Sequence, residues 1–221
     1  MVQSIIKDGG SAEFMVLDVT REDHWQNVIA KVVEKHGGLD VLVNNAGIAV
    51  IQTLLDTSLE EWRRVHAVNL ESVFLGCKSA VDVMRPEGKS GRGGSIINMS
   101  SVGGIIGTER LSSYCSSNGA VQLFTKSVAV ECGRENYGIH VNSVHPGNTL
   151  TPMLQQEWDD MIEQGVVSTI DEAMKFYMDM QVLRDIGQPE DVASIILFLA
   201  FDAARFVTGA EFVVDGSLTA Q

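Results

Sequence analysis

Two hydroxyl side chains stand at a spacing that suits proton transfer to an organic substrate. Ser101 follows a short apolar run, and Tyr114 comes thirteen residues later, where a helical pattern begins. A hydroxyl that donates to a substrate oxygen, beside a phenol that exchanges its proton, is what carbonyl reduction or alcohol oxidation requires when a cofactor carries the hydride. The pair predicts an oxidoreductase site, provided that the fold brings both side chains into one crevice.

Each of these residues also has a simpler interpretation. Ser101 could be a helix cap or a turn hydroxyl, and Tyr114 could be a core aromatic whose polar tip reaches water. Ser100 is the neighbouring candidate, but in a strand it would face the opposite way. The catalytic interpretation therefore depends on the elements and motifs around the pair.

Five short apolar runs without polar alternation recur along the chain, as is typical of strands buried on both faces. The expected strands are Phe14–Leu17, Val41–Val43, Ser95–Met99, His140–Val144 and Glu211–Val214. Longer helical patterns lie between them, over Glu22–Lys35, Leu59–Met84, Ser112–Glu135 and Glu190–Ala200. This alternation predicts an α/β fold, a Rossmann-like doubly wound parallel sheet in three α/β/α layers with right-handed crossovers. The cap of the helix from Leu59 stays open between Asp56, Ser58 and a neighbour.

Length and charge narrow the class of protein. The 221 residues suit a single domain, residues 1–221. Sixteen Lys and Arg against 29 Asp and Glu leave a net charge of −13, which argues against nucleic acid and membrane partners. The longest apolar stretch, Val192–Phe201, falls short of the roughly 20 residues of a membrane span, and the first residues do not resemble a signal peptide. Three scattered cysteines predict unpaired thiols in the cytoplasm and no metal site.

One segment departs from the alternation of strands and helices. Residues 146–185 contain no strand pattern, only helical patterns near Gln155–Gln164 and Asp171–Met180. Ligands of an open parallel sheet bind outside the carboxyl ends of its strands, so this segment lies where a substrate lid would lie. Its methionines and aromatic residues suit an apolar ligand, although packing onto the rest of the protein would explain them equally well.

Several short motifs follow one another in a recognisable order. They are Leu-Asp-Val-Thr at 17–20, Asn-Asn-Ala-Gly at 44–47, Val-Asn at 68–69, Ser101 with Tyr114, Pro-Gly at 146–147, Thr-Pro-Met at 151–153 and Asp-Gly at 215–216. Any one of them would occur by chance, but together they resemble the classical short-chain dehydrogenases/reductases over the whole chain. The resemblance implies an enzyme that interconverts a secondary alcohol and a ketone with NAD or NADP.

The resemblance also implies a role for each matching residue. Tyr114 would be the catalytic acid/base, and Ser101 would polarise the substrate oxygen. Asn69 would hold a water in a proton relay by interrupting its own helix. The cofactor contacts would come from Asp18 and Val19 at the adenine end, from Asn45, Ala46 and Gly47 along the cleft, and from Pro146, Gly147, Thr149 and Thr151 at the nicotinamide carboxamide and nearby phosphate.

Position 118 departs from the family's pattern. The family has Lys four residues after the Tyr, on the same helix face, where this chain has Asn118. An ammonium about 4.5 Å from the phenol would stabilise a phenolate by about 3–4 kcal/mol at an effective dielectric constant of about 20. Asn118 is neutral and short, and could only hydrogen-bond to a ribose hydroxyl. Because 1.36 kcal/mol corresponds to one pKa unit, this stabilisation amounts to roughly two to three units of the phenol pKa. We therefore expect turnover about a hundredfold or more below that of a relative with the Lys.

The start of the chain departs as well. A dinucleotide fold needs a first strand and then a glycine-rich turn that cradles the pyrophosphate at a helix N-terminus. No such turn precedes Asp18, and the glycines at 103, 104 and 107 lie between Ser101 and Tyr114, where the substrate would bind. The sequence predicts an N-terminally truncated domain, in which the strand at Phe14 pairs differently or leaves a sheet edge exposed.

Two functions from different classes remain. The first is an oxidoreductase for a small apolar alcohol or ketone, cyclic or steroid-like, impaired by Asn118 and by the missing N-terminal segment. The resemblance implies a homotetramer or homodimer that packs the helices beginning at Leu59 and Ser112. The alternative, favoured by the two departures, is a non-catalytic relative or a fragment that assembles in the same way but turns over little.

Overall fold

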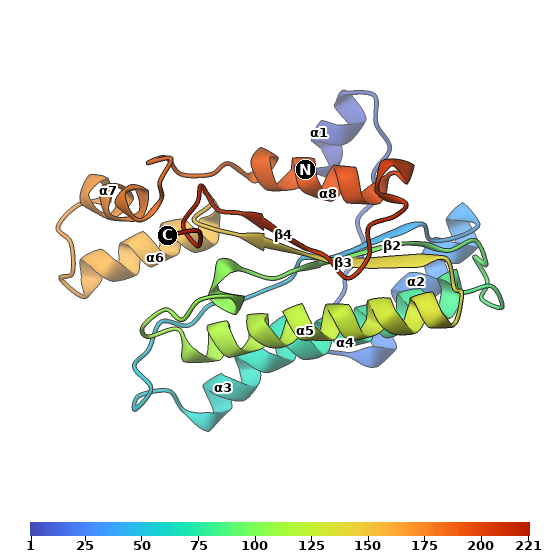
Figure 1. Ribbon diagram of the computed structural model, residues 1–221, viewed down its shortest axis with the longest axis horizontal. Helices are drawn as coiled ribbons and strands as arrows, with labels where there is room; N and C mark the ends of the chain where they lie inside the picture. The colour runs from blue at the N-terminus through green and yellow to red at the C-terminus, as the bar shows by residue number, and fades with distance from the viewer.

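A four-stranded parallel sheet forms the centre of the protein, in a computed structural model that describes all 221 residues (Figure 1). Its strands lie side by side in chain order: β1 (Val41–Asn44), β2 (Gly94–Met99), β3 (Ile139–Pro146) and β4 (Glu211–Val214). Ile96 and Ile97 of β2 point to opposite faces and are both fully buried. Burial on both faces explains why these runs lack polar alternation. The expected Rossmann-like α/β class is confirmed.

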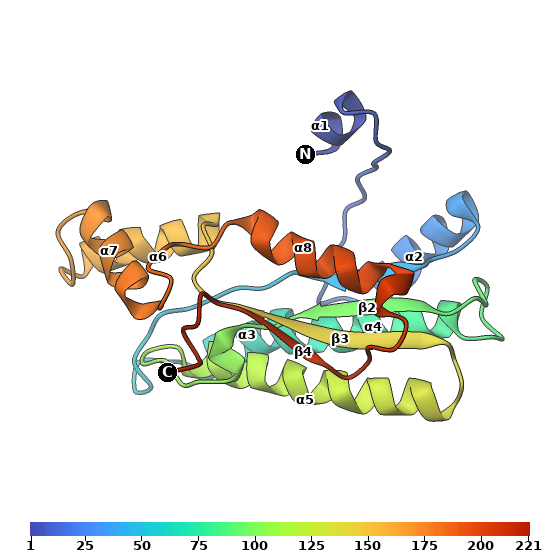
Figure 2. The same cartoon turned by 45° about the horizontal axis from the view of Figure 1, so that its top comes forward.

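Helices cover both faces of the sheet (Figure 2). On one face α4 (Ser72–Met84) and α5 (Ser112–Arg134) pack against β1, β2 and β3, with α2 (Glu22–His36) beside α4. On the other face α8 (Pro189–Ala200) packs against β2, β3 and β4. The crossover through α8 therefore has the opposite hand to those through α4 and α5, because β4 extends the sheet in the same direction. Uniformly right-handed crossovers were the wrong expectation, since the long β3–β4 connection can pass over either face.

The single helix expected over Leu59–Met84 is interrupted in the structure. It runs as α3 (Leu59–His66), a π turn (Ala67–Glu71) and α4 without leaving the helical path. The Ser58 hydroxyl caps α3 by accepting from the Glu61 N–H at 3.1 Å, which settles the open choice of cap. The π turn contains Asn69, and such turns often occur at functional sites.

The expected strand at Phe14–Leu17 is wrong. Residues 9–18 have no regular structure, and the preceding helix α1 (Val2–Lys7) has no buried residue and stands away from the sheet (Figure 2). Phe14 and Val16 are 76% and 77% exposed. An isolated segment cannot form a strand because nothing pairs with its N–H and C=O groups. The open edge of β1 likewise has no partner.

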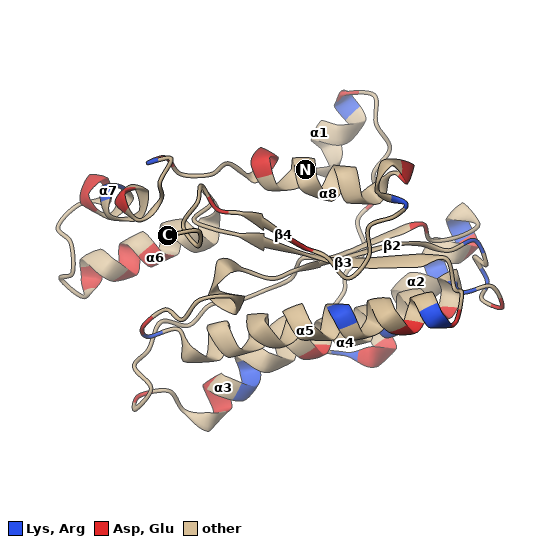
Figure 3. Cartoon of the chain, viewed as in Figure 1, with Lys and Arg blue, Asp and Glu red and all other residues tan.

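Two helices between β3 and α8 form a small unit of their own. α6 (Pro152–Glu163) and α7 (Ile170–Met180) pack around Leu154, Trp158 and Ala173, and a parallel bridge between Thr149 and Gly187 closes the base of the segment. Both helices carry several acidic side chains (Figure 3). Two short 3-10 turns, Val102–Gly104 and Asp202–Ala204, complete the fold. None of the helices combines the length and the apolar character that crossing a membrane would need.

Candidate active site

Ser101 and Tyr114 meet at the carboxyl edge of the sheet. Ser101 lies two residues past the end of β2 and caps the 3-10 turn, and Tyr114 lies in the first turn of α5. The turn lays Gly103 against the Tyr114 ring, so that a methyl group on Gly103 would lie 3.2 Å from Cε1. The absence of a side chain at this glycine lets the two elements approach closely. The sequence spacing thus brings the two residues into one corner of the fold, here called the Ser101–Tyr114 corner.

The Ser101 side chain is well oriented for donating a hydrogen bond. It is buried, and its Oγ accepts from the Gly103 N–H at 3.1 Å. A hydroxyl has one donor and two acceptor positions, so this bond leaves the O–H available to donate to the neighbouring Tyr114 phenol or, when substrate is bound, to the substrate oxygen. Ser100, the alternative candidate, uses its hydroxyl to donate to the Asn118 carbonyl at 3.0 Å. It therefore points toward the backbone of α5.

The electrostatic environment holds Tyr114 in its neutral form. Burial raises the pKa of the Tyr114 phenol, and the carboxylate of Glu157 on α6 raises it further. Hydrogen bonding by the side chains of Ser101 and Asn118 opposes this shift without reversing it. None of these influences on the phenol comes from a cation, which is the influence that the family's Lys would supply.

Asn118 is buried beside Tyr114, but its side chain hydrogen-bonds to the backbone of its own helix. Its Nδ2 donates to the Tyr114 carbonyl one turn earlier, at 3.0 Å. Its backbone also touches Gly104, where a methyl group would come within 2.8 Å of the Asn118 carbonyl carbon. The position predicted from the family pattern therefore faces the site, with an amide in place of a charge.

Asn69 links the π turn to the loop after β1. Its Oδ1 accepts from the Ile48 N–H at 2.9 Å, and its Nδ2 donates to the Ile48 carbonyl at 2.9 Å and to Ser117 Oγ at 3.2 Å. Ser117 in turn donates to the Tyr114 carbonyl at 2.9 Å. A buried chain of hydrogen bonds thus runs from the loop after β1 to the start of α5.

Most of the residues expected to contact the cofactor lie at this same edge. Asn45, Ala46 and Gly47 follow β1 and are exposed, while Pro146 is the last residue of β3 and Gly147 follows it. Gly147 lies so close to β4 that a methyl group would come within 2.8 Å of the Asp215 Cα. Small exposed side chains beside Ser101 fit the close approach of a planar nicotinamide ring.

The other expected contacts are engaged in local hydrogen bonds. The Asp18 carboxylate accepts from the N–H and hydroxyl of Thr20, which lowers its pKa, and the Val19 carbonyl accepts from Trp25 Nε1 at 2.9 Å. The Thr149 hydroxyl donates to the Gly147 carbonyl at 3.2 Å. Thr151 caps α6 by accepting from the Leu154 N–H at 3.3 Å. None of the turns after β1, β2 and β3 is a glycine-rich cradle for a pyrophosphate, since Gly103 and Gly104 after β2 pack on Tyr114 and Asn118.

The segment expected to be a lid divides its apolar residues between two environments. Trp158, Met174 and Met178 pack inside the unit formed by α6 and α7. Met153, Phe176 and Met180 remain exposed. Glu157 accepts from the Tyr177 hydroxyl at 3.0 Å, and burial raises its pKa. Packing thus accounts for one part of the segment and leaves a second part available to a ligand.

His145 is a residue of this corner that the motifs did not single out. It is fully buried near the end of β3, and its Nδ1 lies 3.2 Å from the carbonyl oxygen of Ser101. Its place directly before Pro146 and Gly147, at the end of a buried strand, was the available signal.

The comparisons with known proteins agree with this geometry. A family model described as enoyl-(acyl carrier protein) reductase matches residues 1–219. The chain is 41% identical to cyclopentanol dehydrogenase of Comamonas testosteroni over 219 residues, which is 99% of this chain and 81% of that protein. It is 40% identical to the NADP-dependent (R)-specific alcohol dehydrogenase of Lentilactobacillus kefiri, over 94% of this chain and 77% of that one.

Solved structures of known proteins are similar to this chain as well. A short-chain type dehydrogenase/reductase from Mycobacterium marinum superimposes with a TM-score of 0.87 at 32% identity, covering all of this chain and 80% of that one. The chain belongs to the short-chain dehydrogenase/reductase family. The resemblance read from the motifs is thereby confirmed, as are the enzyme class of alcohol dehydrogenase/reductase, the interconversion of secondary alcohols and ketones, and NAD or NADP as the family's cofactor.

Proposed function

We propose that the Ser101–Tyr114 corner is the catalytic site, where a secondary alcohol and its ketone are interconverted. The observation that carries this proposal is that the Ser101 hydroxyl, whose Oγ accepts from Gly103, keeps its O–H to donate beside the buried Tyr114 phenol, whose pKa is raised by burial. In ketone reduction Ser101 donates a hydrogen bond to the substrate oxygen, and Tyr114 donates its proton to that oxygen. The bound nicotinamide cofactor supplies or accepts the hydride.

The residues around the pair support the steps before and after proton transfer. Hydrogen bonds to the Ile48 backbone and to Ser117, which donates to the Tyr114 carbonyl, fix Asn69 beside the start of α5, where it would hold the water of a proton relay. Asn45, Ala46, Gly47, Pro146 and Gly147 would hold the nicotinamide half. Thr149 and Thr151 would contact the carboxamide and nearby phosphate after giving up their local hydrogen bonds.

Turnover by this chain is expected to be low. Asn118 supplies no positive charge, and Glu157 raises the pKa of Tyr114, so very little phenolate forms at neutral pH. Asp18 and Val19, expected at the adenine end, lie in a segment that does not join the sheet. Both observations favour the second candidate function, a non-catalytic member that binds no cofactor.

The substrate is proposed to be an apolar cyclic or steroid-like alcohol or ketone. Met153, Phe176 and Met180 offer exposed apolar surface on residues 146–185, which would act as a substrate lid within one domain of residues 1–221. A relative that is 41% identical is named for cyclopentanol, a cyclic secondary alcohol. Flexible thioether side chains adapt to ligands of different shape.

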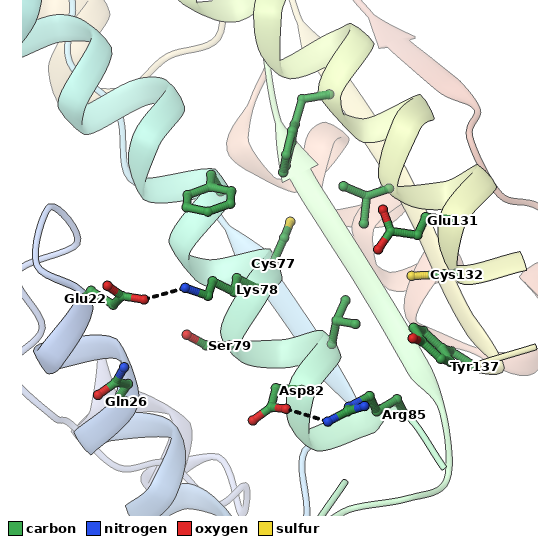
Figure 4. A pocket seen from close by; sticks show the side chains of 14 residues that line it. Glu22, Gln26, Cys77, Lys78, Ser79, Asp82, Arg85, Glu131, Cys132 and Tyr137 are labelled. Atoms are coloured by element: carbon green, nitrogen blue, oxygen red, sulfur yellow. Dashed lines mark hydrogen bonds and ion pairs between the residues drawn. The ribbon is translucent and has the colours of Figure 1, made fainter. Parts of the chain in front are cut away.

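Assembly as a homodimer or homotetramer is proposed through α4 and α5. A groove of about 450 Å³ runs between these helices (Figure 4). The residues that line it include the apolar side chains of Phe74, Phe124 and Val128. Phe74 and Leu123 are exposed on these helices, as expected of apolar residues that a second subunit would cover. A cytoplasmic location is proposed from three cysteines that form no disulfide.

Cofactor titration of the full chain separates the two candidate functions. NAD and NADP are each titrated by calorimetry, and oxidation of cyclopentanol is then followed at saturating cofactor. Measurable binding with slow turnover supports an impaired dehydrogenase. Absence of binding by either nucleotide, in a chain that is folded and oligomeric, would overturn the catalytic proposal and favour the non-catalytic one.

A further inference from the structure

His145 lies behind the Ser101–Tyr114 corner and has no part in the proton transfer proposed above. Side chains alternate along β3, so Ser143 and His145 share one face. Val141, two residues earlier on that face, packs with Val121 and Ala129 of α5. His145 is therefore a fully buried polar side chain between the sheet and the helix that carries Tyr114.

The two ring nitrogens of His145 have different partners. Nδ1 lies 3.2 Å from the Ser101 carbonyl oxygen, and Nε2 lies 2.8 Å from the Ser143 hydroxyl. A carbonyl oxygen only accepts, so the hydrogen atom must be on Nδ1. Burial lowers the pKa of His145, which keeps the ring neutral and makes Nε2 the acceptor of the Ser143 O–H. Both contacts are thus satisfied by one tautomer.

This contact continues the sheet where its backbone ladder stops. The Ser100 N–H still donates to the Val144 carbonyl at 2.8 Å, but Pro146 has no N–H with which to extend the β2–β3 ladder. Beyond that point the connection between β2 and β3 is made by the His145 side chain, which reaches the carbonyl of Ser101.

Ser101 is consequently held by three donors. Its Oγ accepts from Gly103, and its carbonyl accepts from the Gly104 N–H at 2.9 Å and from His145 Nδ1. The two bonds to the carbonyl occupy both of its lone pairs and fix the orientation of the peptide. We propose that His145 is a positioning residue, which as the neutral Nδ1–H tautomer holds the Ser101 peptide so that the hydroxyl is directed toward Tyr114.

This inference rests on the proposed function only in that Ser101 and Tyr114 act together. Two substitutions distinguish the contact made by Nδ1 from the contact made by Nε2. In His145→Asn the amide Nδ2 occupies the place of Nδ1 and can still donate to Ser101. In His145→Gln the longer side chain carries its amide to the place of Nε2 and leaves the Ser101 carbonyl without this donor. Both variants replace imidazole by a neutral amide, so they are matched in polarity.

The first measurement needs no turnover. Nitrogen-15 NMR of histidine-labelled protein, with the His145 signals assigned by their loss in His145→Asn, reports which ring nitrogen bears hydrogen. We expect it on Nδ1 alone. Carbon-13 NMR of labelled tyrosine, with Tyr114 assigned by its loss in Tyr114→Phe, then reports the phenol pKa. We expect that pKa to rise in His145→Gln, as in Ser101→Ala, and to remain near the wild-type value in His145→Asn.

Kinetics provide the second measurement, where turnover is detectable. His145→Gln should lose about fivefold in kcat, the typical effect of one hydrogen bond, with an unchanged KM for the cofactor, while His145→Asn stays within twofold. The role of His145 alone is overturned if the ring hydrogen is found on Nε2. It is also overturned if the Asn and Gln variants behave alike while Ser101→Ala does shift the Tyr114 pKa. No shift of Tyr114 in Ser101→Ala contradicts the catalytic pair itself, and with it this inference.

Discussion

The Ser101–Tyr114 corner and the first twenty residues differ in how much of each region is buried and hydrogen-bonded by the rest of the protein. At the corner, Ser101, Asn69 and Asn118 are buried, and each makes hydrogen bonds to neighbouring backbone. In the first twenty residues, α1 buries nothing, and Phe14 and Val16 face solvent. The same apolar residue types that build β2 therefore build no strand at Phe14, because a strand is stabilised by its neighbours.

This contrast separates the chemistry from the binding of the nucleotide. The corner has the groups for proton transfer in place, whereas Asp18 and Val19, expected to contact adenine, lie outside the sheet. We therefore expect substitutions at the corner to change kcat, and substitutions of the exposed Phe14 and Val16 to leave both kcat and stability almost unaffected. Four experiments test the contrast, beginning with the largest effect.

Tyr114→Phe removes only the phenolic oxygen and should abolish most of the activity. General acid catalysis contributes roughly 10²–10⁴-fold, so we expect a loss of about a thousandfold in kcat. Initial rates with cyclopentanol at saturating cofactor provide the measurement. The control is Tyr137→Phe, which removes an equal oxygen far from the corner, in the groove between α4 and α5. A Tyr114→Phe rate within threefold of wild type would falsify the assignment of this corner.

Asn118→Lys tests whether the missing charge limits turnover. An ammonium near the phenol should lower the pKa of Tyr114, which burial and Glu157 now raise, and increase kcat at neutral pH by about a hundredfold. Asn118→Met is a control of similar length without charge, and it should not exceed the wild-type rate. Equal rates for the Lys and wild-type chains would show that another step limits the reaction.

Glu157→Gln should have a smaller effect in the same direction. Its carboxylate disfavours the phenolate, so its neutral isostere should lower the pKa of Tyr114 and move the alkaline rise of kcat toward lower pH. We expect a gain of a few-fold at pH 7, measured from a pH–rate profile. Glu163→Gln, on the same helix and exposed, is the matched control and should leave the profile in place.

Phe14→Ser should have the smallest effect of the four. The side chain is 76% exposed, so its removal should change the free energy of unfolding by less than about 0.5 kcal/mol. Trp25→Ala, which empties a buried site in α2 next to the same segment, should cost about 3–5 kcal/mol. Urea denaturation of both variants measures the difference. A large loss in Phe14→Ser would show that this segment packs in solution, and the contrast between the two regions would fail.

The sequence was most informative where the local pattern of apolar residues is enough to identify a strand or a helix. Apolar runs located β1 to β4, and helical patterns located α2, α5, α6, α7 and α8 to within a few residues. It could not choose the cap of α3, because Asp56 and Ser58 have similar capping chemistry and only backbone geometry selects Ser58. It also misplaced the Phe14 strand, since apolar character does not reveal whether a partner strand is present.

Residues 146–185 show a second reason why sequence patterns were not decisive. The methionines and aromatic residues among them fitted a ligand surface and internal packing equally well. The structure shows that Trp158 and Met174 belong to the packing, while Met153 and Phe176 are exposed. Residues with the same composition have different roles here because helix rotation decides which face meets the other helix.

Residue types and their order by themselves determined the α/β class, the family and the identity of the hydroxyl pair, because these depend on local periodicity and on short motifs that follow successive strands. Only the tertiary structure showed that the Ser100 hydroxyl donates to the Asn118 carbonyl, that the Asn118 side chain donates to the Tyr114 carbonyl, and that His145 holds the Ser101 carbonyl. Those facts depend on contacts between β2, β3 and α5, whose residues are far apart in the chain and are brought together only by burial of the sheet.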